Sequence, residues 1–135
     1  MKNPLLLAAL ILGLGLTACA TTVPLEAGTR TPAASGKVKV SKDSQGNSRL
    51  NVDVKYLPMP KDLEPSLTTF VVWAVADQGA RVRNLGALNI NGDRSGSVSL
   101  VSPLANFRVI VTAETAGTVE APSDYVVLSG VVGQI

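Results

Sequence analysis

The sequence predicts an all-β domain, an antiparallel β-sandwich of about seven strands that follows a short N-terminal leader. Beyond residue 36, apolar residues alternate with polar ones or form short Val-rich runs, and no helical spacing is sustained. Turn-forming Gly, Asn, Asp and Pro separate these segments about every ten residues, which is typical of a sandwich. The single cysteine excludes an intramolecular disulfide, so core packing has to stabilise the domain.

The expected strands follow in chain order. Alternation in residues 37–40 and 50–56 predicts a hairpin around the polar turn 44–47, with Leu50, Val52, Val54 and Tyr56 facing inward. Residues 68–76 are apolar on both faces, which favours a central strand that is buried on both sides or covered by the tether. Gly86 predicts a bulge or break in the strand that follows. The remaining strands are expected at 81–90, 97–101, 106–114 and 125–129, with a strong turn signal at 91–96.

The first 19 residues have the organisation of an export signal. Lys2 supplies a positive charge, and the uncharged run that follows, about 12 residues long, is too short for a spanning helix of roughly 20 residues. The run ends in Leu16-Thr17-Ala18-Cys19, and this segment resembles the lipobox of bacterial lipoproteins. Two alternatives stay open: an ordinary secretory signal with an incidental Cys19, or a buried N-terminal helix.

The lipobox resemblance implies a compartment and an anchor. In that family the cysteine is acylated and the chain is cut just before it, so residues 1–18 would be the signal peptide. The mature protein would be held at a membrane surface through Cys19, because several acyl chains give stable anchoring. Ala20, where an Asp would retain enteric lipoproteins at the inner membrane, implies the outer membrane in a Gram-negative host.

The segment after Cys19 is rich in Thr, Ala, Pro and Gly and has no period. We therefore expect residues 19–35 to form the lipidated cysteine and a flexible tether, and residues 36–135 to form the β-domain. The alternative is an extra edge strand at 21–23, which Pro24 would cut short.

A second similarity concerns residues 57–130. It rests on the segments TFVVWAV (69–75), RNLGAL (83–88), FRVIVTAE (107–114) and APS (121–123). These segments resemble the extracytoplasmic domain of anti-sigma-K factors and similar Ig-like bacterial sandwiches. The resemblance implies an Ig-like fold. It does not imply control of a sigma factor, because nothing in the chain resembles the sigma-binding region.

The composition argues against several kinds of chemistry. The chain has no histidine, its one cysteine is expected to be lipidated, and the mature part has a net charge of about +1. These features disfavour most nucleophile–base pairs, zinc sites and nucleic-acid binding, although a Ser–Lys dyad stays open. The carboxylates that could form a catalytic pair are Asp62 and Glu64 in the Pro-rich crossover, and Glu114, Glu120 and Asp124, which bracket the last loop; we expect them to be solubilising groups. Asn89, Asn91 and Asp93 are interpreted as a turn rather than a calcium loop. We expect no metal and no cofactor.

Trp73 is expected to be a core anchor on the face that also carries Val71 and Val75. The alternative is an exposed platform for a sugar or a partner. The opposite face, with Phe70, Val72 and Ala74, needs a covering layer, since otherwise it would form an apolar patch that marks an interaction site. The apolar C-terminal segment is either the last strand or an edge for strand addition, with Tyr125 and Val127 as candidate partner-binding residues.

Together these observations predict a non-catalytic, membrane-anchored envelope lipoprotein that binds or assembles with a protein partner. A small-ligand or glycan-binding lipoprotein is the alternative, and exposed aromatic side chains beside a groove would favour it. An enzyme ranks third. The sequence does not determine the oligomeric state.

Overall fold

The computed structural model describes residues 20–133. The fold is all-β, as predicted, with 54% strand and 6% helix. Its strands are β1 (Thr21–Ala27), β2 (Ser35–Lys42), β3 (Ser48–Lys55), β4 (Thr69–Ala76), β5 (Arg81–Leu88), β6 (Gly96–Ser102), β7 (Phe107–Glu114) and β8 (Val126–Val132). The helical turns are α1 (Pro60–Leu63) and η1 (Asp77–Gly79). Within residues 20–133, the structure contains no helix that is both long enough and apolar enough to span a bilayer.

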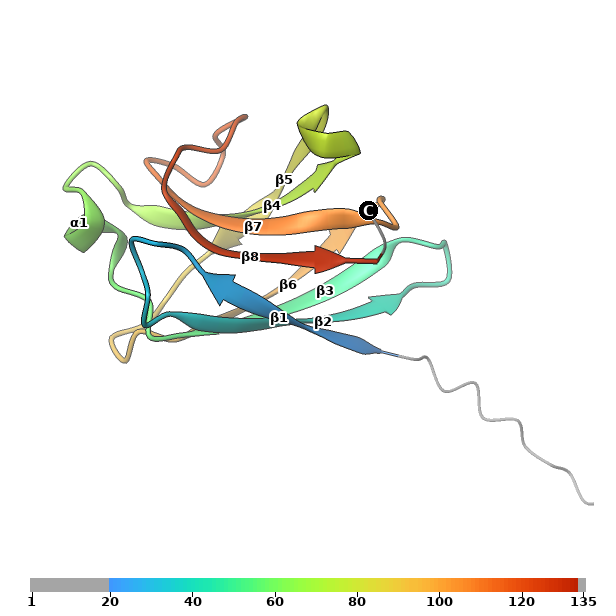
Figure 1. The fold of residues 1–135 in the computed structure, drawn as a ribbon, viewed down its shortest axis with the longest axis horizontal. Helices are drawn as coiled ribbons and strands as arrows, with labels where there is room; N and C mark the ends of the chain where they lie inside the picture. The colour runs from blue at the N-terminus through green and yellow to red at the C-terminus, as the bar shows by residue number, and fades with distance from the viewer. Residues whose placement is uncertain (1–19, 134–135) are drawn as a thin grey trace, which may run out of the picture.

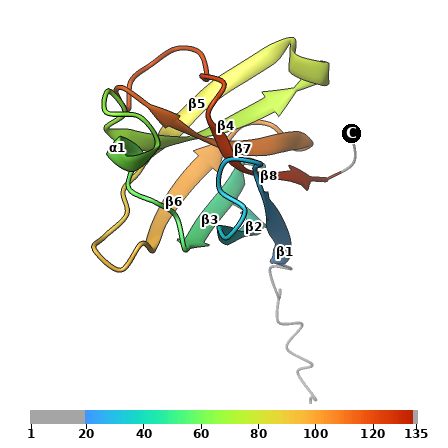
Figure 2. The same ribbon diagram turned by 60° about the vertical axis from the view of Figure 1, so that its left-hand side comes forward.

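The strands form one antiparallel sheet in the order β5-β4-β7-β8-β1-β2-β3-β6. The sheet curls until β5 and β6 approach each other, and the molecule is therefore nearly a barrel (Figures 1 and 2). The sheet bends from one half to the other at β1, because β1 pairs with β2 over Thr21–Leu25 and with β8 at Glu26 and Ala27. One strand thus joins the two halves of the sheet.

The expected tether is wrong for residues 21–27, because these residues are β1. Leu25 is buried in the core, and Pro24 lies opposite Lys37 of β2 without ending the strand. Proline is tolerated there because β1 pairs with β8 only beyond that point, so the missing N–H lies on an unpaired side. The β-domain therefore begins near Thr21 rather than Gly36, and it has one strand more than expected.

The core lies between the two halves of the curled sheet. Leu50, Val52 and Val54 are buried as the alternation predicted. Tyr56 is an exception: the prediction that it faces inward is wrong, and it is 64% exposed. The backbone at Tyr56 is left-handed, with φ of 59°, and this ends the alternation one residue after β3.

Strand β4 is buried on both faces, as predicted, by two different coverings. Phe70, Val72 and Ala74 belong to the main core. Trp73 is fully buried as well, but it points away from that core, together with Val71. The predicted irregularity at Gly86 is present, because Val72 pairs with Gly86 and Trp73 with Asn84, which leaves Leu85 as an extra residue in β5.

The strands end at two opposite ends of the molecule, the entry end and the loop end (Figure 1). The entry end comprises the start of β1, the β2–β3 hairpin (43–47), the β4–β5 turn (77–80), the β6–β7 loop (103–106) and the end of β8. The loop end comprises the β1–β2 loop (28–34), the β3–β4 segment (56–68) with α1, the β5–β6 turn (89–95) and the β7–β8 loop (115–125).

Candidate functional site

The predicted lipidation site lies outside the described residues. Cys19 and the cleavage motif Leu16, Thr17 and Ala18 precede Ala20, where the description begins. The structure nevertheless places the residues that follow: Ala20 leads directly into β1 at the entry end.

The predicted partner-binding edge at Tyr125 and Val127 is wrong as an edge. β8 pairs with β7 on one side and with β1 on the other. Val127 is 1% exposed, and its carbonyl accepts hydrogen bonds from the Gly28 N–H (2.8 Å) and the Thr31 hydroxyl (2.9 Å). The position is occupied by β1 and the loop after it, the segment that the sequence indicated to be a tether.

Tyr125 instead belongs to a polar cluster that joins three loops of the loop end. Its hydroxyl donates a short hydrogen bond to the Glu64 carboxylate, which also accepts a bond from the Ser66 hydroxyl (2.8 Å). The guanidinium carbon of Arg30 lies 4.2 Å from the centre of the Tyr125 ring, within cation–π range. We call Arg30, Glu64, Ser66 and Tyr125 the loop-end cluster.

The loop-end cluster shifts the ionisation of both of its acids. The Tyr125 hydroxyl, and then the Ser66 hydroxyl, lower the pKa of Glu64, because they stabilise its carboxylate. The bond to Glu64 in turn raises the pKa of Tyr125, because it favours the protonated phenol. At neutral pH the pair is therefore a phenol donating to a carboxylate, with the positive charge of Arg30 nearby.

A second polar group covers the outward face of β4. The indole N–H of Trp73 donates to the Thr112 hydroxyl (2.8 Å), which donates to the Glu114 carboxylate (2.6 Å). Thr112 is fully buried and Glu114 is 5% exposed. The same carboxylate oxygen accepts the backbone N–H of Ser123 (2.7 Å). We call Trp73, Thr112, Glu114 and Ser123 the buried chain.

The buried chain holds the β7–β8 loop over Trp73. The Ser123 hydroxyl donates to the Ala113 carbonyl (2.9 Å) and accepts the Tyr125 N–H (3.2 Å), so the two polar groups meet at Ser123. Farther along the loop, the Asn84 side chain donates to the carbonyls of Gly117 and Val119, both at 2.9 Å. The loop is thereby attached to β5 and β7, and it closes the outer face of the sheet.

The candidate acids Glu64 and Glu114 are held in two separate polar groups, and the expectation of a solubilising role is wrong for Glu114, which is a buried residue of β7. The Glu64 and Glu114 carboxylates, which could have faced a common substrate, each have their own hydrogen-bond partners. Asp93 accepts from the Ser95 hydroxyl (2.7 Å), and Asn91 and Ser95 close the turn that the sequence predicted. Across residues 20–133, no group of three or more His, Cys, Asp or Glu side chains could hold a metal ion.

Two hollows lie at the entry end. One of about 520 Å³ is lined by Val75, Asp77, Gln78, Gly79 and Arg108. Another, of about 420 Å³, lies between the β4–β5 turn and the β6–β7 loop. Neither is lined by the acids that the sequence suggested as candidates.

Sequence reasoning missed Arg30, Thr112 and Ser123. Arg30 was placed in a tether, and a Thr inside a Val-rich strand or a Ser in a Pro-containing loop carries no local signal of burial. One sign was available: Thr112 and Glu114 are polar residues in a segment of buried-strand type, and buried polar residues require partners.

No protein-family model matches the chain, and no curated protein matches its sequence.

Proposed function

We propose that the protein is a membrane-anchored extracytoplasmic lipoprotein, lipidated on Cys19, whose β-domain is a non-catalytic binding or assembly module of the cell envelope. The observation that carries this proposal is that the two ends of the domain differ. The chain enters at one end, and three loops are joined by the loop-end cluster at the other. An anchor at the entry end would direct the loop end away from the membrane, toward a partner.

The loop end is suited to recognition because its shape is determined by side-chain contacts rather than by flexible loops. Tyr125, Glu64 and Arg30 come from different loops, so their contacts restrict one loop relative to another. A preorganised surface loses less conformational entropy when it binds. The exposed charges of the loop-end segments, among them Lys61, Asp62 and Glu120, supply polar contacts for a protein partner.

The support for a non-enzyme is the chemistry of the side chains. The chain has no histidine, and the buried carboxylate of Glu114 is engaged by Thr112 and Ser123. The bond from the Ser123 N–H positions the β7–β8 loop, and the bond from Thr112 lies within β7. A general acid or base has to reach a substrate proton, whereas this carboxylate lies beneath the loop.

The Ig-like classification belongs to the same proposal. Its support is the order β5-β4-β7-β8, which corresponds to the C′-C-F-G half of a variable-type Ig sheet. Two features depart from that pattern: β2 and β3 form a hairpin, and Trp73 faces away from the main core.

Glycan or small-ligand binding is the second candidate, and one observation favours it. Tyr56 is 64% exposed at the loop end, and an exposed aromatic ring can stack on a sugar. A soluble-domain screen that shows binding lost in Tyr56→Ala, with unchanged thermal stability, would support this candidate.

The anchor is tested with Cys19→Ala in cells. Lipidation predicts loss of membrane fractionation or retention of the uncleaved precursor. Membrane fractionation of the variant at the mature size would contradict the proposal.

The partner-binding face is tested by crosslinking in cells, followed by mass spectrometry. Lys61→Glu changes an exposed residue of the loop end, and Lys39→Glu makes the same change near the entry end. We expect a partner that is lost in Lys61→Glu and retained in Lys39→Glu. The reverse result, or equal crosslinking in both variants, would overturn the assignment of the loop end as the binding face.

A further inference from the structure

The positive charge of the domain is concentrated at the entry end. We divide each strand at its midpoint and group each half with the loops at its end of the molecule. The entry half of residues 20–133 then carries six basic and two acidic side chains, a net charge of about +4. The basic residues, all of them exposed, are Lys39, Lys42, Arg49, Arg81, Arg83 and Arg108. The other half carries five basic and eight acidic side chains, a net charge of about −3. A nearly neutral domain is thus strongly dipolar along the axis that runs between its ends.

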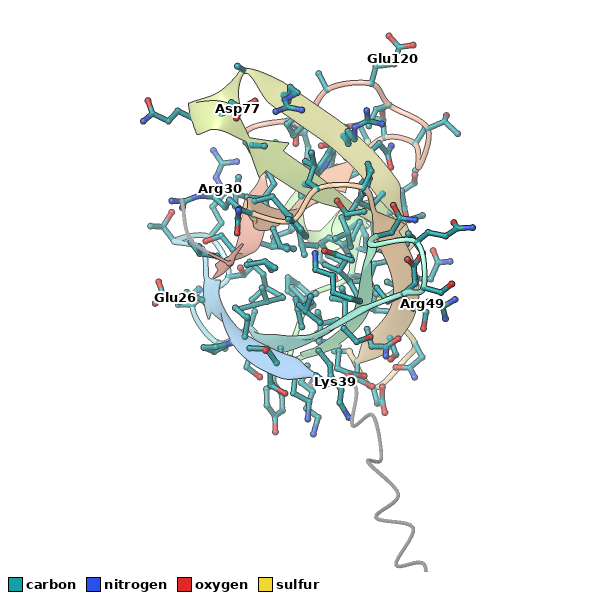
Figure 3. The ribbon with its side chains drawn as sticks, turned by 90° about the vertical axis from the view of Figure 1, so that its right-hand side faces the viewer. Glu26, Arg30, Lys39, Arg49, Asp77 and Glu120 are labelled. Carbon is teal, nitrogen blue, oxygen red and sulfur yellow. The ribbon has the colours of Figure 1, made fainter. Side chains whose placement is uncertain are left out.

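The two acids of the entry end leave this asymmetry in place. The Asp77 carboxylate accepts a hydrogen bond from the Arg81 guanidinium at 2.5 Å, so these two charges largely offset each other. Asp43 is used within the β2–β3 hairpin, where it accepts the N–H groups of Gln45 and Asn47. Figure 3 looks onto this end, with Lys39, Arg49 and Asp77 at its margins.

Exposed apolar side chains collect at the same end. Among residues 20–133, four large hydrophobic residues are exposed: Tyr56, Val82, Val101 and Val131. The three valines are each one residue from a strand terminus at the entry end, in β5, β6 and β8. Val101 lies opposite Arg49, and Val131 lies opposite Arg108. Basic residues interleaved with apolar ones are typical of surfaces that rest on anionic lipid.

The covalent chain places this end close to the proposed anchor. Because β1 begins at Thr21, only Ala20 separates Cys19 from the domain. Two residues span at most about 7 Å, which is less than the Debye length of about 8 Å at physiological ionic strength. Charges at the entry end would therefore experience the surface potential of the membrane with little screening.

We propose that the entry end is a membrane-contacting surface that rests on anionic phospholipid, so that the domain stands upright with its loop end outward. The basic side chains provide electrostatic attraction, and the three valines contact the interface between headgroups and acyl chains. The negative charge of the loop half disfavours the inverted orientation. This inference rests on the proposed anchoring at Cys19, and it adds a lipid class and an orientation to it.

The experiment uses the only cysteine of the chain to reproduce the anchor without cellular acylation. Unacylated protein of residues 19–135 is coupled through Cys19 to a maleimide-bearing lipid, in vesicles rich in phosphatidylglycerol or in vesicles of phosphatidylcholine alone. A water-soluble amine reagent then labels lysines, and mass spectrometry gives the labelling at each site. Lys39 and Lys42 report on the entry end, while Lys55 and Lys61 in the same molecule are the matched controls.

We expect the entry-end lysines to be labelled at least about threefold more slowly on anionic than on neutral vesicles, with the loop-half lysines unchanged. High salt should remove the protection, because it screens the attraction. Equal labelling of both pairs on both vesicles would overturn the inference. Protection of Lys55 and Lys61 instead would show that the domain lies on its loop end.

A charge-matched pair of variants distinguishes an effect of the entry-end residues on vesicle binding from an effect of the net charge of the protein. Each basic residue near an anionic surface contributes about fivefold to partitioning. Lys39→Gln/Arg49→Gln/Arg83→Gln should therefore reduce sedimentation of the uncoupled Cys19→Ser protein with phosphatidylglycerol vesicles at least about tenfold. Lys55→Gln/Lys61→Gln/Arg94→Gln removes the same net charge and should reduce it far less, and an equal reduction would contradict a specific surface.

The two proposals fail separately. Loss of protection on anionic vesicles, together with lipidation of Cys19 in cells, would leave the lipoprotein proposal standing and remove the membrane-contacting surface. An unlipidated Cys19 in cells, with clear protection in vitro, would remove the lipoprotein proposal and leave the membrane-contacting surface standing.

Discussion

The two faces of β4 are buried by different means. The inner face, with Phe70, Val72 and Ala74, is covered by the other half of the curled sheet, and its contacts are apolar. The outer face, with Val71 and Trp73, is covered by the β7–β8 loop. The buried chain links this face of the sheet to the loop through hydrogen bonds. A neighbouring strand satisfies its own backbone through the sheet, whereas a loop brings N–H and C=O groups that need other partners.

The different coverings of the two faces explain why polar residues interrupt the apolar sequence of β7. Thr112 and Glu114 lie in β7 on the face beneath the loop, while Val109, Val111 and Ala113 alternate with them toward the main core. Buried polar groups are costly unless every one is paired. In residues 20–133, no buried side-chain nitrogen or oxygen lacks a hydrogen-bond partner. The outer layer is thus specified by hydrogen bonds, and the inner core is specified by shape and volume.

Truncation of the two aromatic anchors should have the largest effect. Phe70→Ala and Trp73→Ala should each lower the free energy of unfolding by about 3–5 kcal/mol in urea denaturation, because each leaves a large cavity. Amide hydrogen exchange distinguishes the two variants. Trp73→Ala should speed exchange in the β7–β8 loop more than elsewhere, whereas Phe70→Ala should not single out this loop. A cost below about 1 kcal/mol for Trp73→Ala would show that the outer layer does not contribute to the stability of the fold.

Removal of the indole N–H alone should have an intermediate effect. Trp73→Phe keeps an aromatic ring but loses the donor to the Thr112 hydroxyl, so a loss of about 1–3 kcal/mol is expected, from the hydrogen bond and the smaller ring. Thr112→Val, in the Trp73→Phe background, should then cost less than in the parent protein. Additive losses in this double-mutant cycle would argue against coupling within the buried chain.

Neutralising the buried carboxylate should cost about 1 kcal/mol. Glu114→Gln retains an acceptor for the Thr112 hydroxyl and the Ser123 N–H, but it loses the extra strength of charged hydrogen bonds. Glu120→Gln is the matched control in the β7–β8 loop that follows, where the side chain is exposed, and it should change the free energy of unfolding by less than about 0.5 kcal/mol. Equal effects of the two variants would show that the Glu114 charge is not used.

The smallest expected effect is the pH dependence of the loop-end cluster. The pKa of Glu64 is lowered in the folded state, so its contribution is present above its ordinary pKa of 4.5 and is lost as pH falls through the lower folded value. The pKa of Tyr125 is raised, so its contribution is present below pH 10.0 and is lost as pH rises through the higher folded value. The cluster is therefore intact across the neutral range.

Absorbance titration can test this directly. In a Tyr56→Phe background the phenolate signal reports on Tyr125 alone, because the chain has two tyrosines. Glu64→Gln should lower the pKa of Tyr125 toward its ordinary value. An unchanged titration would show that the bond between Tyr125 and Glu64 does not form in solution.

Local patterns predicted most of the sheet but little of the candidate sites. Alternation placed Leu50, Val52 and Val54 in the core, and Gly86 marked the bulge, because these features depend on neighbours within one strand. The loop-end cluster joins Arg30, Glu64 and Tyr125 across separations that no local pattern encodes. Burial of Trp73 was predicted correctly, but the loop that covers its face was not.

The amino-acid sequence by itself determined the all-β class, the apolar character of both faces of β4 and the absence of histidine and disulfide chemistry. The lipobox-like segment at Cys19 also came from the sequence, and its role remains a prediction. Tertiary structure alone decided that residues 21–27 are a strand, that β8 is internal, and that the charges separate into a basic and an acidic half. The physical reason is that a strand with Pro and Thr is stabilised mainly by its partners: β1 exists because β2 and β8 offer it hydrogen bonds and a place for Leu25 in the core.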